Sequence, residues 1–183
     1  MKKNIIAIIP ARKSSKRLKN KNSLFLGDKR LFQWSLELAK KIYFLSKIVV
    51  KSDSKKILSF IKDNECIKNL RPEKFSGDNI KLTDVALYLI KIFEKKNYKV
   101  DAIALLQPTS PFRSKKIILE GIKSFYKSKG RNSVVSVSSV KKHPRVCIIK
   151  KNKTLKPYFT NHAFDKQSQE LDEVLAPNGS LYI

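Results

Sequence analysis

The chain has 183 residues, a formal net charge of +25 and a hydrophobic content of 42%. This length is enough for one domain with a continuous apolar core, and we place no boundary within residues 1–183. No apolar run reaches the roughly 20 residues that a membrane span needs, so we predict no contact with a membrane.

The positive charge comes mainly from lysine, because only seven of the 40 basic residues are arginine. Arginine recognises phosphates and bases with a planar fork, and the lysines are spread along the chain instead of forming one block. The charge favours an anionic substrate and non-selective attraction of polyanions. It does not indicate specific binding to nucleic acid.

Strand and helix patterns alternate along the chain. The apolar runs predict strands over residues 4–10, 47–51, 102–106 and 133–140. Apolar residues at helical spacing predict helices over residues 31–45, 55–64, 82–96 and 115–127, the second capped by Ser52 or Ser54. The alternation predicts an α/β fold: a single domain with a mostly parallel sheet and helices on both faces. Ligands of such sheets bind at the carboxyl ends of the strands, here after Pro10, Ser52, Gln107 and Val140.

The loop over residues 10–22 follows the first predicted strand and carries six basic side chains, two serines and two asparagines. Transfer of a nucleotidyl group needs cations and oriented amides around a triphosphate, and this loop offers both. It has no GxxxxGK[ST] sequence, which excludes a Walker P-loop. A solvated basic loop in a lysine-rich protein is the alternative interpretation.

Cys66 and Cys147 are far apart in the sequence and lack the spacing of metal ligands. Only His143 and His162 could assist them, so we expect no zinc site. We predict that both thiols are reduced and that the protein is cytoplasmic.

Six stretches of the chain, in order, carry a recognisable pattern. They are IIPAR at 8–12 with Ser15, Lys16, Lys21 and Asn22; IVVKSD at 48–53; LRPE at 70–73; LLQPTSPFR at 105–113; SVVSV at 133–137; and SQEL at 168–171 with PNGSLYI at 177–183. Together they resemble the acylneuraminate cytidylyltransferase family, the CMP–sialic acid synthetases. The resemblance implies a Rossmann-like nucleotidyltransferase fold. It also implies transfer of CMP from CTP to an acidic, sialic-acid-like sugar, with release of pyrophosphate. The alternatives are a transferase of the same fold for another sugar or nucleotide, and a non-enzymatic basic nucleic-acid-binding protein.

The resemblance also implies roles for individual residues. Arg12 and Lys21 would be catalytic, with Lys21 neutralising charge at the α-phosphate. The remaining contacts to the triphosphate would come from Ser15, Lys16 and Asn22. The cytosine would lie against Arg71 and the backbone of Pro10 and Ala11. The sugar acid would be lined by Gln107, Thr109, Ser110, Gln169 and Asn178, with Arg145 or Lys166 as the cation for its carboxylate.

Simpler roles remain open for several of these positions. Pro108 and Pro111 can fix a rigid turn, and Arg113 can pair structurally. Asp53 can likewise be a turn residue.

The chain departs from the resembled family in three places. Lys13, Ser14 and Arg17 stand where the family has glycines, and Ser168 stands where a basic residue is expected. Family members also continue beyond Ile183, where they supply aspartates for Mg²⁺ and part of a homodimer contact. We therefore expect Mg²⁺ as cofactor without its usual ligands, a homodimer in full-length form, and weak or no activity from this chain alone.

Overall fold

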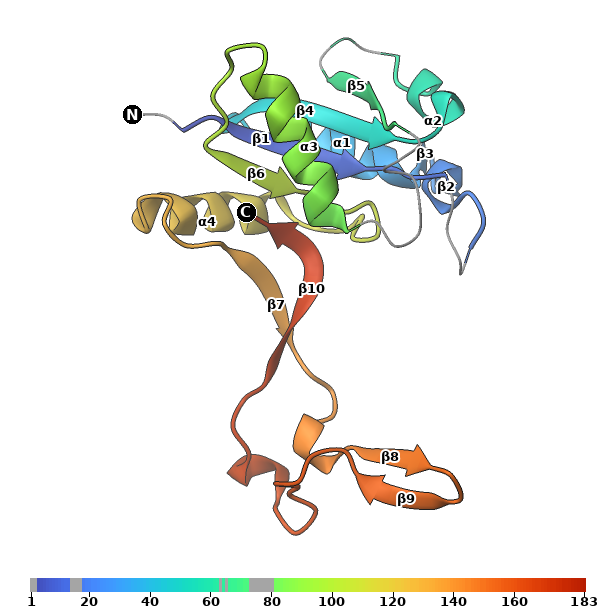
Figure 1. The fold of residues 1–183 in the computed structure, drawn as a ribbon, viewed down its shortest axis with the longest axis vertical. Coiled ribbons are helices and arrows are strands. Elements are labelled where there is room, and N and C mark those ends of the chain that lie inside the picture. Colours follow the sequence, from blue (N-terminus) through green and yellow to red (C-terminus); the bar gives the residue numbers. More distant parts are fainter. Residues whose placement is uncertain (1–2, 14–17, 63, 65, 73–80) are drawn as a thin grey trace. The chain divides into compact units, whose positions relative to one another are not determined.

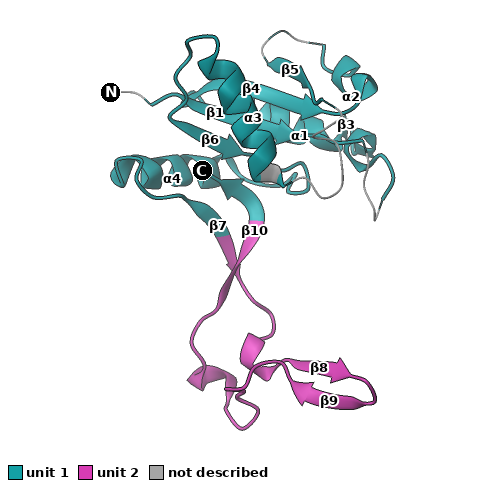
Figure 2. Cartoon of the chain, in the orientation of Figure 1, with its two compact units in different colours: residues 1–136, 179–183 teal, residues 137–178 magenta. Residues whose placement is uncertain are grey.

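The structure is a computed structural model that describes residues 3–13, 18–62, 64, 66–72 and 81–183. Two compact units are distinguished within it, one formed by residues 1–136 and 179–183 and the other by residues 137–178 (Figure 2). The single domain predicted over residues 1–183 stays a prediction. Among the described residues, no helix combines the length and apolar character required to cross a membrane.

A six-stranded sheet in the order β5-β4-β1-β6-β10-β7 forms the centre of the fold. Its strands are β1 (Ile5–Pro10), β4 (Leu45–Ser52), β5 (Ile67–Leu70), β6 (Ala102–Leu105), β7 (Val135–Ser139) and β10 (Leu175–Tyr182). Strand β1 pairs in parallel with β4 and β6, and β4 pairs in parallel with β5. Strand β10 runs antiparallel to β6, with Tyr182 opposite Leu105. The predicted mostly parallel sheet is confirmed.

Helices cover both faces of this sheet. Ile5, Ala7 and Ile9 of β1 pack in one core with α1 (Leu31–Lys40), α2 (Lys55–Ser59) and α4 (Lys115–Lys127). Ile6 and Ile8 pack on the other face against α3 (Leu82–Glu94). Figure 1 shows α3 on the near side of β1 and β4, with α1 behind them. All residues over 5–9 are fully buried, which explains the continuous apolar run in the sequence.

Three predicted helices are shorter than the apolar spacing suggested, of which α3 ends two residues early, at Glu94 and not at Lys96. Helix α1 ends at Lys40 and not at Leu45, which begins β4. Ile42 still enters the core, but it does so from a turn in which its N–H donates to the carbonyl of Ala39. Helix α2 ends at Ser59 and not at Asn64, and Ser54 caps its start by accepting from the N–H of Ile57.

The sequence patterns did not predict two small hairpins. Strands β2 (Phe25–Leu26) and β3 (Lys29–Arg30) form one of them, and β8 (Ile148–Lys151) and β9 (Thr154–Pro157) form the other. The described residues also include the 3₁₀ turns η1 (Lys21–Ser23), η3 (Pro144–Val146) and η4 (Ser168–Glu170). Within the part of the chain that the structure describes, neither Cys66 nor Cys147 forms a disulfide.

Candidate functional site

The backbone at the carboxyl end of β1 is fixed against β4. The N–H of Ala11 donates to the carbonyl of Lys51 at 2.8 Å, and the Ser52 hydroxyl donates to the carbonyl of Ala11 at 2.6 Å. Ala11 and Ser52 are fully buried, while Pro10 is partly exposed. Pro10 and Ala11 therefore form a rigid floor at the edge where ligands of parallel sheets bind.

The basic loop after β1 returns to the end of that strand. The side-chain amide of Asn22, which is 5% exposed, donates to the carbonyl of Arg12 at 2.8 Å. Lys21 is the preceding residue and begins η1, and it is partly exposed, as is Arg12. Arg12 and Lys21 thus belong to one local structure at the sheet edge. The predicted contacts Ser15 and Lys16 lie outside the described residues.

Arg71 reaches the same edge from the end of β5. Its N–H donates to the carbonyl of Ser52 at 2.7 Å, and the residue is 8% exposed. Burial lowers the pKa of the Arg71 guanidinium, the carboxylate of Asp53 opposes that effect, and the charge of Arg12 adds to it. Arg12, Asp53 and Arg71 are therefore close enough for their charges to interact. This brings the predicted base-facing arginine beside the predicted phosphate-binding arginine.

Asp53, for which the sequence left a turn role open, fixes the start of the basic loop. One of its carboxylate oxygens accepts the N–H of Lys13 at 2.6 Å. This contact joins the end of β4 to the residue after Arg12. Asp53 therefore both shapes the loop and supplies negative charge next to two arginines.

Lys51 is a member of this site that the sequence reasoning missed. It lies in β4 with no exposed surface, and its Nζ donates to the carbonyl of Val85 in α3 at 3.2 Å. Burial, and then the charge of Arg71, lower its pKa to about 8. The available signal was a lysine that directly follows Ile48, Val49 and Val50 in a buried strand.

The turn after β6 presents Gln107 and Ser110. Arg113, 7% exposed, braces this turn by donating to the carbonyl of Gln107 and, at 3.1 Å, to the hydroxyl of Ser35 in α1. Burial lowers the pKa of Arg113 to about 10. Of the two roles open for Arg113, the structure shows the structural one.

Gly179 lies next to the side-chain oxygens of this turn. A Cβ at Gly179 would be 3.7 Å from Oε1 of Gln107 and 3.8 Å from Oγ of Ser110, and the backbone φ there is +77°. Gly179, near the end of the chain, is thus brought beside the Gln107 turn. Thr109, the third predicted residue of the turn, is exposed.

The remaining predicted sugar contacts lie in the unit over residues 137–178. The Arg145 guanidinium donates from Nε to the carbonyl of Asn161 at 2.7 Å, and Gln169 is exposed in η4. The Asn178 amide donates to the carbonyl of Val137 and to the Ser138 hydroxyl.

Lys166, the other candidate cation for the sugar carboxylate, lines a cavity of about 320 Å³ in the same unit. Lys141, Lys142 and His143 line it as well, together with the acidic residues Asp172 and Glu173. Arg145 is not among its lining residues. Lys166 is therefore the one of these two candidate cations that lines this cavity.

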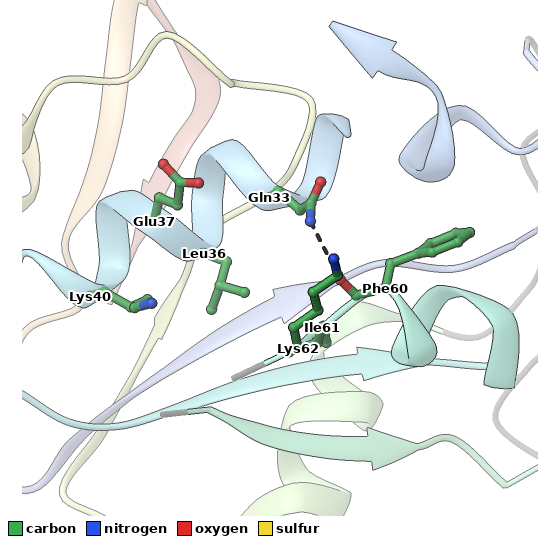
Figure 3. Close-up of a pocket in the computed structure, with 7 residues that line it drawn as sticks. All are labelled: Gln33, Leu36, Glu37, Lys40, Phe60, Ile61 and Lys62. Carbon is green, nitrogen blue, oxygen red and sulfur yellow. Dashed lines mark hydrogen bonds between the residues drawn. The ribbon is translucent and has the colours of Figure 1, made fainter. Parts of the chain in front are cut away.

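A second cavity of about 300 Å³ lies between α1 and the end of α2 (Figure 3). Its floor is apolar and its rim is charged, and the amide of Gln33 crosses it to the carbonyl of Phe60 at 3.5 Å. Its lining residues are Gln33, Leu36, Glu37, Lys40, Phe60, Ile61 and Lys62. None of these is a predicted site residue.

Among the described residues, no three His, Cys, Asp or Glu side chains lie close enough together to hold a metal ion. The residues that the structure describes therefore do not fit a Mg²⁺ ion held by the protein alone.

A family model described as cytidylyltransferase matches residues 6–177, which is nearly the whole chain. The chain belongs to the cytidylyltransferase family. An N-acylneuraminate cytidylyltransferase of Escherichia coli is 32% identical over 187 residues, covering 100% of this chain and 42% of that protein. A CMP-N,N'-diacetyllegionaminic acid synthase of Legionella pneumophila is 35% identical over 144 residues, covering 78% of this chain and 61% of that protein. The chain thus spans less than two thirds of either relative.

The fold of this cytidylyltransferase-family chain also matches solved structures. CMP:2-keto-3-deoxy-manno-octonic acid synthetase complexed with CTP aligns with a TM-score of 0.69 and 16% identity, over 98% of this chain and 73% of that one. A 4-diphosphocytidyl-2C-methyl-D-erythritol synthase aligns with a TM-score of 0.67 and 11% identity, over 100% of this chain and 75% of that one. These matches confirm the predicted nucleotidyltransferase fold.

Proposed function

We propose that the chain binds CTP at the carboxyl edge of its sheet and carries the site that couples CMP to an acidic, sialic-acid-like sugar, with weak or no turnover by this chain alone. The observation that carries the proposal is the convergence of Arg12, Asp53 and Arg71 at the end of β1, where Asn22, the residue after Lys21, donates to the carbonyl of Arg12. Such a cluster suits a triphosphate, because oriented cations stabilise charge that develops during phosphoryl-type transfer. We infer the nucleotide, CTP, from membership of the cytidylyltransferase family, and the class of sugar from the named relatives.

In the proposed reaction, the anomeric hydroxyl of the sugar attacks the α-phosphorus of CTP. A bond from that oxygen to the α-phosphorus forms, and the bond from the α-phosphorus to the oxygen that bridges to the β-phosphate breaks. Pyrophosphate leaves with the bridging oxygen, and the proton of the hydroxyl goes to solvent. Arg12 and Lys21 hold the phosphates in line, and the Gln107 turn orients the sugar. Catalysis then comes mainly from positioning and charge neutralisation.

We also propose two partners for the protein, a Mg²⁺ ion and a second copy of itself. Because the described residues do not fit a metal held by the protein alone, Mg²⁺ would arrive bound to the triphosphate. Homodimer formation by the full-length protein and a cytoplasmic location are parts of the same proposal. The alternative of a basic nucleic-acid-binding module is not favoured, because the matching family model and the named relatives are cytidylyltransferases or CMP-sugar synthases.

Thermal shift with each nucleoside triphosphate and Mg²⁺, at low and high salt, tests the nucleotide. We expect CTP to raise the melting temperature more than ATP, GTP or UTP does. In the presence of CTP, an acidic sugar that is a substrate should raise the melting temperature further. Arg12→Ala and Lys21→Ala should each remove the CTP effect. Lys19→Ala, an exposed lysine of the same loop, is the matched control and should keep it. Equal stabilisation by all four nucleotides would overturn the proposal.

A further inference from the structure

Lys51 is enclosed at the ligand-binding edge of the sheet. Its side chain has no exposed surface, its Nζ donates to the carbonyl of Val85 at 3.2 Å, and that nitrogen lies 4.5 Å from the ring centroid of Tyr88. Lysine is almost never fully buried in a core without a compensating partner. A carbonyl dipole and an aromatic face hold this amine between β4 and the first turns of α3.

The charged and titratable groups around Lys51 come from each neighbouring element. Arg71, after β5, is the charge that acts on it directly. Tyr88 of α3 supplies its ring, whereas Asp84 in the first turn of α3 is exposed. Arg12 and Asp53, which follow β1 and β4, act on Arg71.

Two buried cations, Lys51 and Arg71, therefore lie near each other at this edge. Burial and the charge of Arg71 lower the pKa of Lys51 to about 8. A phosphate that binds at Arg12, whose charge acts on Arg71, would oppose both effects, because a nearby negative charge favours the protonated amine. At pH 8 the Lys51 amine would then be partly neutral without ligand and fully protonated with ligand.

We infer that Lys51 is a positioning residue behind Arg71, and that an anionic nucleotide bound at this edge drives uptake of a solvent proton by the Lys51 amine. The proton joins the nitrogen lone pair, and no other bond forms or breaks. The charged amine holds the Val85 carbonyl more strongly and thereby anchors the start of α3 at the site. The inference rests on the proposed function for the identity of the nucleotide.

Isothermal titration calorimetry with CTP and with ATP, in buffers of different ionisation enthalpy, measures this proton directly. At pH 8 the terminal phosphate is largely ionised, since a phosphate monoester has its second pKa at about 6. We expect uptake of about half a proton per CTP at pH 8, because the free amine is half protonated there. Between pH 8 and 9 the affinity should fall by up to about tenfold.

Three variants distinguish the specific effect of Lys51 from the effect of removing any positive charge. Lys51→Met should bind CTP weakly at every pH without proton uptake, and Lys51→Arg should bind from pH 7 to pH 9 without uptake, because arginine stays charged. Lys47→Met is the matched control. It removes a lysine from the same strand and the same face, whose Nζ lies 4.9 Å from the Tyr98 ring centroid, and it should behave as the parent chain does.

The outcomes separate this inference from the proposed function. Undiminished proton uptake in Lys51→Met overturns the role of Lys51 and leaves CTP selectivity intact. If Lys51→Met does not fold, undiminished uptake in Lys51→Arg overturns the role of Lys51 instead. Loss of uptake in Lys47→Met also overturns it. Equal binding of ATP and CTP with uptake that depends on Lys51 supports the inference and contradicts CTP selectivity. No binding of either nucleotide overturns both.

Discussion

The side-chain amide of Asn22 donates a hydrogen bond to the backbone carbonyl of Arg12 at 2.8 Å. The bond joins residues ten positions apart and is partly buried. It closes the basic loop onto the end of β1, so that Arg12 and Lys21 are held by one local structure. The placement of the proposed phosphate site depends on this closure.

Asn22→Ala should therefore weaken CTP binding and destabilise the fold. The substitution leaves the Arg12 carbonyl without this donor, which costs about 1–3 kcal/mol for a buried group. Urea unfolding measures the stability, and calorimetric titration measures the affinity. Ser23→Ala is the matched control, because its hydroxyl donates to the Asn20 carbonyl in an exposed position of the same turn. If the two variants bind CTP equally well, the closure does not shape the site.

Arg113→Met should destabilise the protein by about 1–3 kcal/mol, because it leaves the Gln107 carbonyl and the Ser35 hydroxyl without their donor. Urea unfolding again measures this change. Ser35→Ala removes only the second contact and should cost less. Unchanged stability of Arg113→Met would mean that Arg113 does not brace the turn.

Lys51→Met should raise the free energy of unfolding at pH 7 by about 1–3 kcal/mol, since an apolar side chain avoids the cost of burying charge. The sign follows from the lowered pKa of Lys51, about 8 against an ordinary value of 10.5. Below pH 8 both the folded and unfolded states carry the proton, and the parent chain bears the whole cost. Between pH 8 and 10.5 the unfolded state holds more protons, so the parent gains stability as the pH rises.

Unfolding of both proteins at pH 7 and pH 10 checks this difference. The advantage of Lys51→Met should shrink at pH 10. An advantage that is the same at both pH values would show that Lys51 titrates normally in the folded protein.

Much of the fold follows from local patterns in the sequence. The continuous apolar run over residues 4–10 predicts β1, and the helical spacing after Ser114 predicts α4 with its observed bounds. The ends of α1 and α2 are not predictable in this way. Ile42 and Ile61 keep the helical spacing but enter the core from turns, and spacing alone does not distinguish the two.

The site was predictable only where a motif marks it. Arg12, Lys21 and Gln107 stand in recognisable stretches at strand ends, whereas Lys51 becomes notable only through its contact with α3. This contact between β4 and α3 joins residues 34 positions apart in the sequence, so a local pattern does not reveal it. The bracing role of Arg113 likewise depends on Ser35 in a different element.

A crystal structure of the chain soaked with CTP tests the central claim most directly. We predict density for the α-phosphate between Arg12 and Lys21, with the cytosine against Arg71 and the backbone of Pro10 and Ala11. Ordered CTP in the cavity between α1 and α2, with the end of β1 empty, would contradict the account.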